Sequence, residues 1–217
     1  MKQDAIKIRI TFRKTAAVRY VSHLDMMRAF KRALRRSGLP IVYTEGFNVH
    51  PVMIFTPPLS VGYLSECELL DIGLTKDVPL KDILSALCRS LPEGFMATEV
   101  KYAKNKISDI YTSVYEIASP ELLGKKEAFL SFAAEKEIII SRSTKGGEKT
   151  VDCAPFIKNA AFEEDGKTAK ITLTLPSNND ISVNPRLVIE EFMRREGVAA
   201  SPDYKRIALL DKNGNSF

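Results

Sequence analysis

Residues 19–58 read RYVSHLDMMRAFKRALRRSGLPIVYTEGFNVHPVMIFTPP, and this stretch holds both histidines of the chain, a dense group of cations and many turn residues. Within it, Ser22 and Asp25 have the S-x-x-D spacing with which a hydroxyl and a carboxylate cap the free backbone N–H groups at the start of a helix. Gly38 and Pro40 are residues that commonly follow the end of one. The stretch therefore predicts a helix that begins at Ser22 and ends before Gly38.

The predicted helix has two chemically different faces. On a projection of about 100° per residue, its apolar side chains share one arc. The opposite side carries five cations, namely Arg28, Lys31, Arg32, Arg35 and Arg36. Between residues 13 and 36, eight cations stand against a single anion, although the whole chain has a net charge of only +5. Positive charge gathered in this way favours a polyanionic or acidic partner.

Further elements are predicted on both sides of this helix. Residues 6–13 alternate between apolar and polar side chains, which is typical of a half-buried strand with Lys7, Arg9 and Arg13 on a solvated face. After the helix, the sequence predicts strands at 41–44, 53–55 and 68–74, a helix at 79–91 and a strand at 95–102. The order strand, helix, strand, strand, helix, strand is typical of a ferredoxin-like unit.

The second half of the chain repeats this order of elements. We expect strands at 111–118, 137–142, 168–175 and 204–210, and helices at 120–135 and 185–196. The span 144–166 fits this order poorly, and a long hairpin with arms 151–163 and 168–175 accounts for it best. We therefore predict an α+β protein of two tandem ferredoxin-like (βαββαβ) units with antiparallel sheets. The domains are residues 1–105 and residues 106–217, the second with a long hairpin insertion.

Composition excludes several classes of protein. With 45% hydrophobic and 27% charged residues the chain is globular, and it has neither a run of about 18 apolar residues nor a secretory signal. We expect a cytoplasmic protein that does not interact with membranes. Cys67, Cys88 and Cys153 are far apart and odd in number, which argues against a disulfide framework and against C-x-x-C metal sites. Neither a cofactor nor a bound metal is expected.

The predicted topology brings polar residues together at one end of the first sheet. In a sheet of order 4-1-3-2, the start of the first helix and the loop after a second strand at 41–44 lie at the same end. His23 and Asp25 are therefore expected near Asn48 and His50, with Arg19 on the same rim. A neutral histidine beside a phosphodiester could take the proton of a ribose 2′-hydroxyl while an arginine or the second histidine stabilises the charge that develops.

Other interpretations of this group remain open. His23, His50 and Asp25 are the candidate catalytic residues, but two histidines and an aspartate could instead bind a divalent metal, or only fix the loop. Phe47 lies between two turn residues and either offers a ring on which a base could stack or plugs its loop, and the plug is the simpler interpretation. The candidates for binding nucleic acid or a partner are Arg19, Arg28, Lys31, Arg32, Arg35, Arg36, Phe47 and Asn48. No phosphate-binding loop, zinc-protease or nucleophile-elbow motif occurs in the sequence.

Several segments resemble a bacterial family of radical-SAM-linked proteins. They are RYVSHLDMMR at 19–28, GLP at 38–40, GFNVHP at 46–51, PLSVG at 58–62 and S-E-x-E-x-x-D at 65–71, with Val49 where the family usually has proline. The resemblance implies a domain that is fused to, or encoded beside, a B12-binding-type radical SAM enzyme, often near genes for a G-type ribonuclease and ribosomal proteins. This chain lacks the C-x-x-x-C-x-x-C of a radical SAM active site, so the iron–sulfur cluster would belong to a separate chain.

The cationic helix and the ribosomal neighbourhood both favour RNA. We therefore predict an accessory RNA-binding or substrate-presenting protein that works with a radical SAM enzyme in RNA or ribosome-related modification, with tRNA or rRNA as the ligand and no catalysis of its own. One alternative is a metal-independent endoribonuclease that uses His23 and His50, an idea that rests on fold analogy. Another is a protein-interaction module whose basic helix docks on an acidic protein surface.

Overall fold

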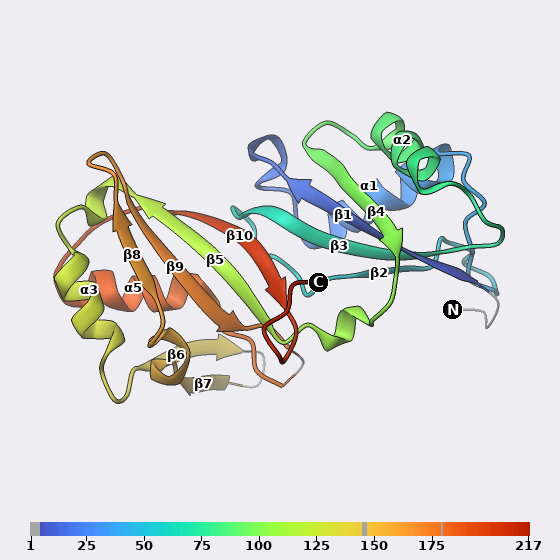
Figure 1. Ribbon diagram of the computed structural model, residues 1–217. Helices are drawn as coiled ribbons and strands as arrows, with labels where there is room; N and C mark the ends of the chain where they lie inside the picture. Colours follow the sequence, from blue (N-terminus) through green and yellow to red (C-terminus); the bar gives the residue numbers. More distant parts are fainter. Residues whose placement is uncertain (1–4, 145–146, 179) are drawn as a thin grey trace. The chain divides into compact units, whose positions relative to one another are not determined.

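The computed structural model describes residues 5–144, 147–178 and 180–217 (Figure 1). It is a mixed α+β protein whose strand pairs are antiparallel within each part of the chain, which confirms the predicted class. The chain divides into two compact units, Met1–Asp109 and Ile110–Phe217. The described part of the chain contains no helix long and apolar enough to cross a membrane.

The first unit contains four strands and two α-helices. In chain order its elements are β1 (Ile6–Lys14), η1 (Ala16–Val18), α1 (His23–Arg36), β2 (Met53–Phe55), β3 (Leu64–Leu74), α2 (Leu80–Ser90), β4 (Phe95–Tyr102) and η2 (Ile107–Asp109). β1 pairs with β3 on one side and with β4 on the other, and β2 pairs with the remaining edge of β3. The strand order within this unit is therefore β4-β1-β3-β2, the order predicted from the sequence.

The edge of β3 opposite β1 is lined by two short segments with a loop between them. The strand predicted at 53–55 is confirmed as β2, whereas the strand predicted at 41–44 is reduced to isolated bridges at Ile41 and Tyr43. The backbone N–H of Val42 donates to Gly73 of β3, and that of Val52 donates to Val42 at 3.0 Å. The chain thus runs beside β3, leaves it, and returns next to the point where it left. We call residues 43–51 the excursion loop.

Both helices of the first unit pack on one face of its sheet (Figure 1). A hydrophobic core lies between these helices and the sheet. The alternation predicted for β1 places its isoleucines and Phe12 on the side that faces this core. Phe12 and Phe30 of α1 lie 4.5 Å apart between ring centroids, and Phe55 and Phe95 complete an aromatic cluster with edge-to-face contacts. This cluster fixes α1 against the sheet, so that its other face is turned to solvent.

The second unit has a four-stranded sheet and a separate hairpin. Its elements are β5 (Thr112–Ser119), η3 (Pro120–Leu122), α3 (Lys126–Ala133), β6 (Ile139–Thr144), β7 (Gly147–Asp152), α4 (Ala154–Ile157), β8 (Ala161–Glu164), β9 (Ala169–Pro176), α5 (Pro185–Glu196) and β10 (Asp203–Leu210). The pairings give the order β10-β5-β9-β8 within this unit, and β6 pairs with β7 in a two-stranded sheet.

Two predictions for this unit were wrong in part. The strand expected at 137–142 is β6, but it lies in the small hairpin, and the strand next to β9 is β8. Of the hairpin arm expected at 151–163, only the segment around β8, which is four residues long, pairs with β9. The carboxylate of Asp152 accepts the backbone N–H groups of Ile138 (2.9 Å) and Ala154 (3.0 Å), which fixes the turn into α4. These local bonds to a side chain compete with extension of the strand.

Capping residues at both ends of α5, and a glycine before α3, explain where these two helices begin and end. Asn184 caps α5 through the backbone N–H of Arg186, and Gly197 ends the helix in the left-handed conformation, so the helix predicted at 185–196 is confirmed. The helix predicted at 120–135 begins only at Lys126, because Gly124 has a φ of +74° and separates a short 3₁₀ turn from α3.

Candidate functional site

The start of α1 is fixed by the predicted cap. The backbone N–H of Asp25 donates to Ser22 Oγ at 3.1 Å, and the Ser22 hydroxyl donates to the Asp25 carboxylate at 2.8 Å. Arg28 donates to the other oxygen of Asp25 at 2.9 Å. The bond from Ser22 and then that from Arg28 hold the pKa of Asp25 below its usual value. Asp25 is thus the helix cap predicted from its spacing to Ser22 and an ion-pair partner of Arg28, while its candidacy as a catalytic residue stays a prediction.

His23 packs at the first turn of α1. The ring is half-buried and meets Phe55 of β2 edge-on, with the centroids 5.9 Å apart. Phe55 also belongs to the aromatic cluster of the core. This contact gives His23 a packing role at the end of the sheet where β1 and β2 finish.

The excursion loop is held closed by Thr44 and His50. The backbone N–H of Thr44 donates to the carbonyl of His50 at 2.9 Å, and the N–H of His50 donates to Thr44 Oγ1 at 3.1 Å. His50 Nδ1 lies 2.7 Å from the carbonyl oxygen of Asn48. Because a carbonyl oxygen can only accept, Nδ1 of the neutral ring must carry the proton, and Nε2 is left with its lone pair. Thr44, which orients this ring, was missed in the sequence because nothing in its spacing links it to His50.

Arg35 joins the excursion loop to the far end of α1. Its Nη2 donates to the carbonyl of Val49 at 3.0 Å, and Arg35 lies in the last turn of the helix, whereas His23 lies in the first. At about 1.5 Å per residue these two turns are about 18 Å apart along the helix axis. His50 and Asn48 therefore lie near the end of the helix opposite to His23 and Asp25. The prediction that these residues converge was wrong, because the loop leaves the sheet beside Gly73 and Leu74 of β3 and precedes β2, instead of following the end of the second strand.

Phe47 forms the tip of the excursion loop and is fully exposed, at 114% of its reference area. The plug interpretation was therefore wrong. Gly46, with a φ of +100°, turns the chain just before it, and Asn48 is exposed just after it. The ring is presented on a loop whose base is tied by Thr44, His50 and the contact to α1.

Of the five cations predicted on the outer face of α1, Arg28 is paired with Asp25, and the other four lack a carboxylate ion-pair partner among the described residues. Lys31 and Arg32 make no ion pair with any residue that the structure describes. Arg35 donates to the carbonyl of Val49, as above, and Arg36 donates to the carbonyl of Ser90 at 2.9 Å. Backbone carbonyls orient these guanidinium groups but do not cancel their charge. We call Lys31, Arg32, Arg35 and Arg36 the α1 cationic face.

The arginines of α5 are different, since each has an acidic partner. Arg186 pairs with Glu190 at 2.7 Å, and both Arg194 and Arg195 pair with Glu191, at 2.8 and 2.7 Å. The bond from Arg194, followed by that from Arg195, lowers the pKa of Glu191 to about 2. A helix of the same chain can therefore neutralise its own arginines, which the α1 cationic face does not do.

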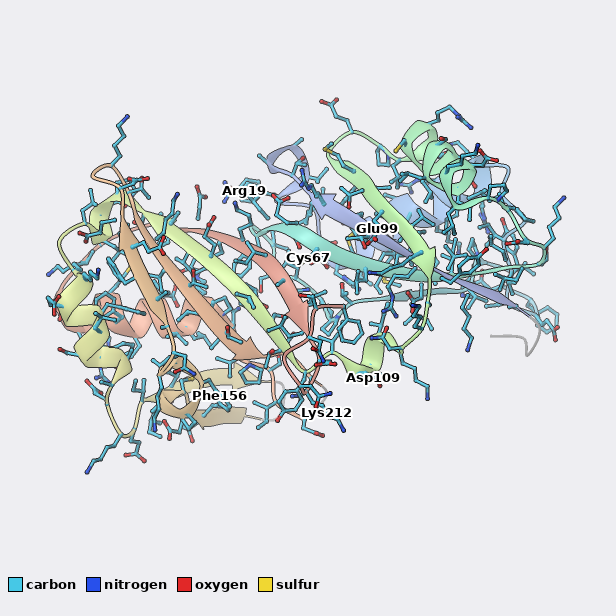
Figure 2. All side chains as sticks on the ribbon, in the orientation of Figure 1. Arg19, Cys67, Glu99, Asp109, Phe156 and Lys212 are labelled. Carbon is cyan, nitrogen blue, oxygen red and sulfur yellow. The ribbon has the colours of Figure 1, made fainter. Side chains whose placement is uncertain are left out.

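On the face of the first sheet opposite the helices, most cations are paired, although Lys7 is exposed and makes no ion pair with a described residue. Arg13 pairs with Glu66 at 2.7 Å, and Lys101 pairs with Glu99 of β4 at 3.4 Å (Figure 2). Arg9 is only 1% exposed, and its guanidinium donates twice to Asp71, at 2.8 Å each, which corrects its assignment to a solvated face. This face therefore presents little net charge to solvent.

Lys14 and Arg19, two of the eight cations between residues 13 and 36, form hydrogen bonds that hold the loops near the end of β1. Lys14 is 3% exposed, and its Nζ donates to the carbonyls of Arg19 at 2.7 Å and Tyr63 at 3.1 Å. Arg19 itself donates from Nε to the carbonyl of Gly62 at 3.2 Å and lies in the loop after β1 (Figure 2). These bonds tie the segment before α1 to the segment before β3, so Arg19 lies at the His23 end of the helix, away from the excursion loop.

The described residues thus form an α+β protein with antiparallel sheets, in which Lys31, Arg32, Arg35 and Arg36 of α1 make no ion pair with a described carboxylate. Residues 7–185 match the model of the family described as "Uncharacterized protein conserved in bacteria (DUF2344)", and the chain belongs to this family. No curated protein matches the sequence.

Similar solved structures add little to this assignment. The crystal structure of an unknown protein from Galdieria sulphuraria is 11% identical, with 93% of this chain and 99% of that chain covered and a TM-score of 0.29. The crystal structure of a "putative glycine cleavage system transcriptional repressor" is 13% identical, with 94% and 99% covered and a TM-score of 0.28. Similarity at this level supports no functional argument.

Proposed function

We propose that this chain is an RNA-binding protein that presents RNA to a partner enzyme, and that it binds RNA through the α1 cationic face. The observation that carries the proposal is the absence of carboxylate ion-pair partners for this face among the described residues. By contrast, the arginines of α5 and Arg9, Arg13 and Lys101 of the open sheet face are paired. Unpaired cations on one helix face suit the phosphates of a nucleic acid, which release counterions when they are neutralised.

The resemblance to radical-SAM-linked proteins supports the choice of partner. In this proposal a separate radical SAM enzyme modifies the RNA, which is tRNA or rRNA, and the present chain supplies affinity without catalysis. The strand orders β4-β1-β3-β2 and β10-β5-β9-β8 support a related proposal, that the chain consists of two tandem ferredoxin-like units.

The endoribonuclease alternative loses its geometric basis. It required His23 and His50 at one phosphodiester, and they lie near opposite ends of α1. The interaction-module alternative uses the same cations as the RNA proposal, with an acidic protein in place of phosphate, and the experiment below separates the two.

We expect the double variant Lys31→Gln, Arg32→Gln to bind RNA more weakly and with less dependence on salt. Removal of two phosphate contacts should reduce the slope of log K against log salt concentration by about 1.4 for a single strand. Fluorescence anisotropy of a labelled single-stranded RNA, titrated with the full chain at several salt concentrations, measures both quantities. Glutamine has a helix propensity close to that of lysine and arginine, so the helix should persist.

The matched control is Arg194→Gln, Arg195→Gln in α5, which changes the net charge by the same amount at two neighbouring arginines that already have acidic partners. This control should leave the salt dependence close to that of the wild type. The proposal fails if the wild type does not bind RNA at low salt, or if the two double variants have the same effect. Failure to bind RNA, with nuclease-resistant co-purification of an enzyme, would favour the interaction module.

A further inference from the structure

We infer that the excursion loop binds one unstacked base of a single-stranded RNA, with Phe47 as the stacking surface and His50 Nε2 as the hydrogen-bond acceptor for the edge of the base. This inference rests on the proposed function, because it assigns a nucleotide to the loop that lies beside the α1 cationic face. It also narrows the ligand to single-stranded RNA, because a base inside a duplex exposes neither its face nor its pairing edge.

The first observation is an exposed aromatic ring on a tied loop. Phe47 is fully exposed, yet the loop that carries it is closed by the Thr44 and His50 bonds and by the bond from Arg35 to Val49. A ring on a loop that is already ordered loses little conformational entropy when a ligand binds. Stacking on such a ring does not depend on which base is present, because every base has a π-face.

The second observation is the state of the His50 ring. Nδ1 is committed to the carbonyl of Asn48, with Thr44 Oγ1 also 3.2 Å away, so Nε2 is the ring atom with a lone pair to offer. Each of the four RNA bases has an N–H group on its pairing edge that could donate to this atom. A base that is already paired has no such group available, which gives the loop a preference for single strands.

The third observation is the position of the loop relative to positive charge. The Arg35 guanidinium contacts the loop directly, and Lys31 lies four residues earlier, on the same side of α1. A nucleotide with its base on Phe47 would therefore have its backbone next to the α1 cationic face. Stacking and phosphate contacts on one continuous surface are the usual combination in proteins that bind single strands.

The variant Phe47→Trp tests the stacking directly. The chain contains no tryptophan, so the new residue is the only source of indole fluorescence. We expect its emission to be quenched when a short oligouridine is added at low salt, and to change much less with a duplex of equal length. The control is Tyr20→Trp, at a site 75% exposed near the other end of α1, which should not be quenched.

Affinity gives a second measurement. Phe47→Ala should weaken the binding of the single strand about 5-fold to 150-fold, the range seen for loss of one stacked base, without a change in the salt slope. His50→Asn keeps a donor in the position of Nδ1 but removes the Nε2 acceptor, and it should weaken binding while circular dichroism remains that of the wild type.

The possible results separate the inference from the proposed function. Unquenched emission of Phe47→Trp at saturating RNA, equal quenching by the duplex, or wild-type affinity of Phe47→Ala would each overturn the inference. If the Lys31, Arg32 double variant still binds weakly in those cases, the proposed function stands. If the wild type does not bind RNA at low salt, both are wrong.

Discussion

Replacement of Arg9 with methionine should lower the free energy of unfolding by about 3–5 kcal/mol, the usual cost of removing one partner of a buried ion pair. The guanidinium donates twice to Asp71 and twice to Asn105, and methionine leaves the carboxylate of Asp71 buried without its partner. Chemical denaturation followed by circular dichroism measures the change. Asn105 lies just beyond β4, so the variant should also loosen the segment that follows this strand.

Two controls make the Arg9 prediction specific. Arg13→Met, on the same strand, removes an arginine whose partner Glu66 is exposed, and it should cost about 0–1 kcal/mol. The double variant Arg9→Met, Asp71→Leu removes the uncompensated charge and should recover part of the loss. A change of less than about 1 kcal/mol for Arg9→Met alone would show that the buried pair does not stabilise the first unit.

Replacement of Lys14 with methionine should cost a similar amount, about 3–5 kcal/mol. Its ammonium group satisfies two buried carbonyls, those of Arg19 and Tyr63, and it lies near Glu68, whose side chain is almost completely buried. Loss of the cation would remove the bonds from its ammonium group to these two carbonyls. Lys7→Met, at an exposed position of the same strand, is the control and should have little effect.

The pH dependence of the Lys14 variant is a further test. Burial lowers the pKa of Lys14 below its ordinary value of 10.5, with Arg19 adding to the shift and Glu68 opposing it. Since the folded protein releases this proton at a lower pH than the unfolded chain, the unfolded chain binds more protons in the interval just below pH 10.5. The difference in the free energy of unfolding between the wild type and Lys14→Met should therefore increase as the pH rises through that interval. A difference that does not change with pH would contradict the lowered pKa of Lys14.

The sequence predicted those features that depend on neighbours in the chain. The cap of α1 follows from Ser22 and Asp25, which are three residues apart, and the core face of β1 follows from simple alternation. The strand order of the first unit follows from the order of its elements, because few topologies accommodate two helices on one side of an antiparallel sheet. The charge on α1 was also visible, since helical spacing assigns each cation to a face.

The features that could not be predicted depend on residues far apart in the chain. Arg9 resembles any solvated arginine until Asp71 is placed opposite it, and these residues are separated by 62 positions. The predicted position of His50 depended on which of two segments, 41–44 or 53–55, forms the longer pairing with β3. Because apolar residues occupy both segments, periodicity alone does not distinguish them, and the wrong choice moved the loop to the wrong end of α1.

The closure of the excursion loop has a consequence for how such a protein can evolve. Val42 and Val52 are joined by a backbone hydrogen bond, so the sheet is already continuous across the points where the loop leaves and returns. The exposed residues 45–49 can change in length and composition without altering the register of β2 or the core beneath it. Relatives with the same fold could thus differ in this loop alone, and the same junction offers a place to graft a segment of choice.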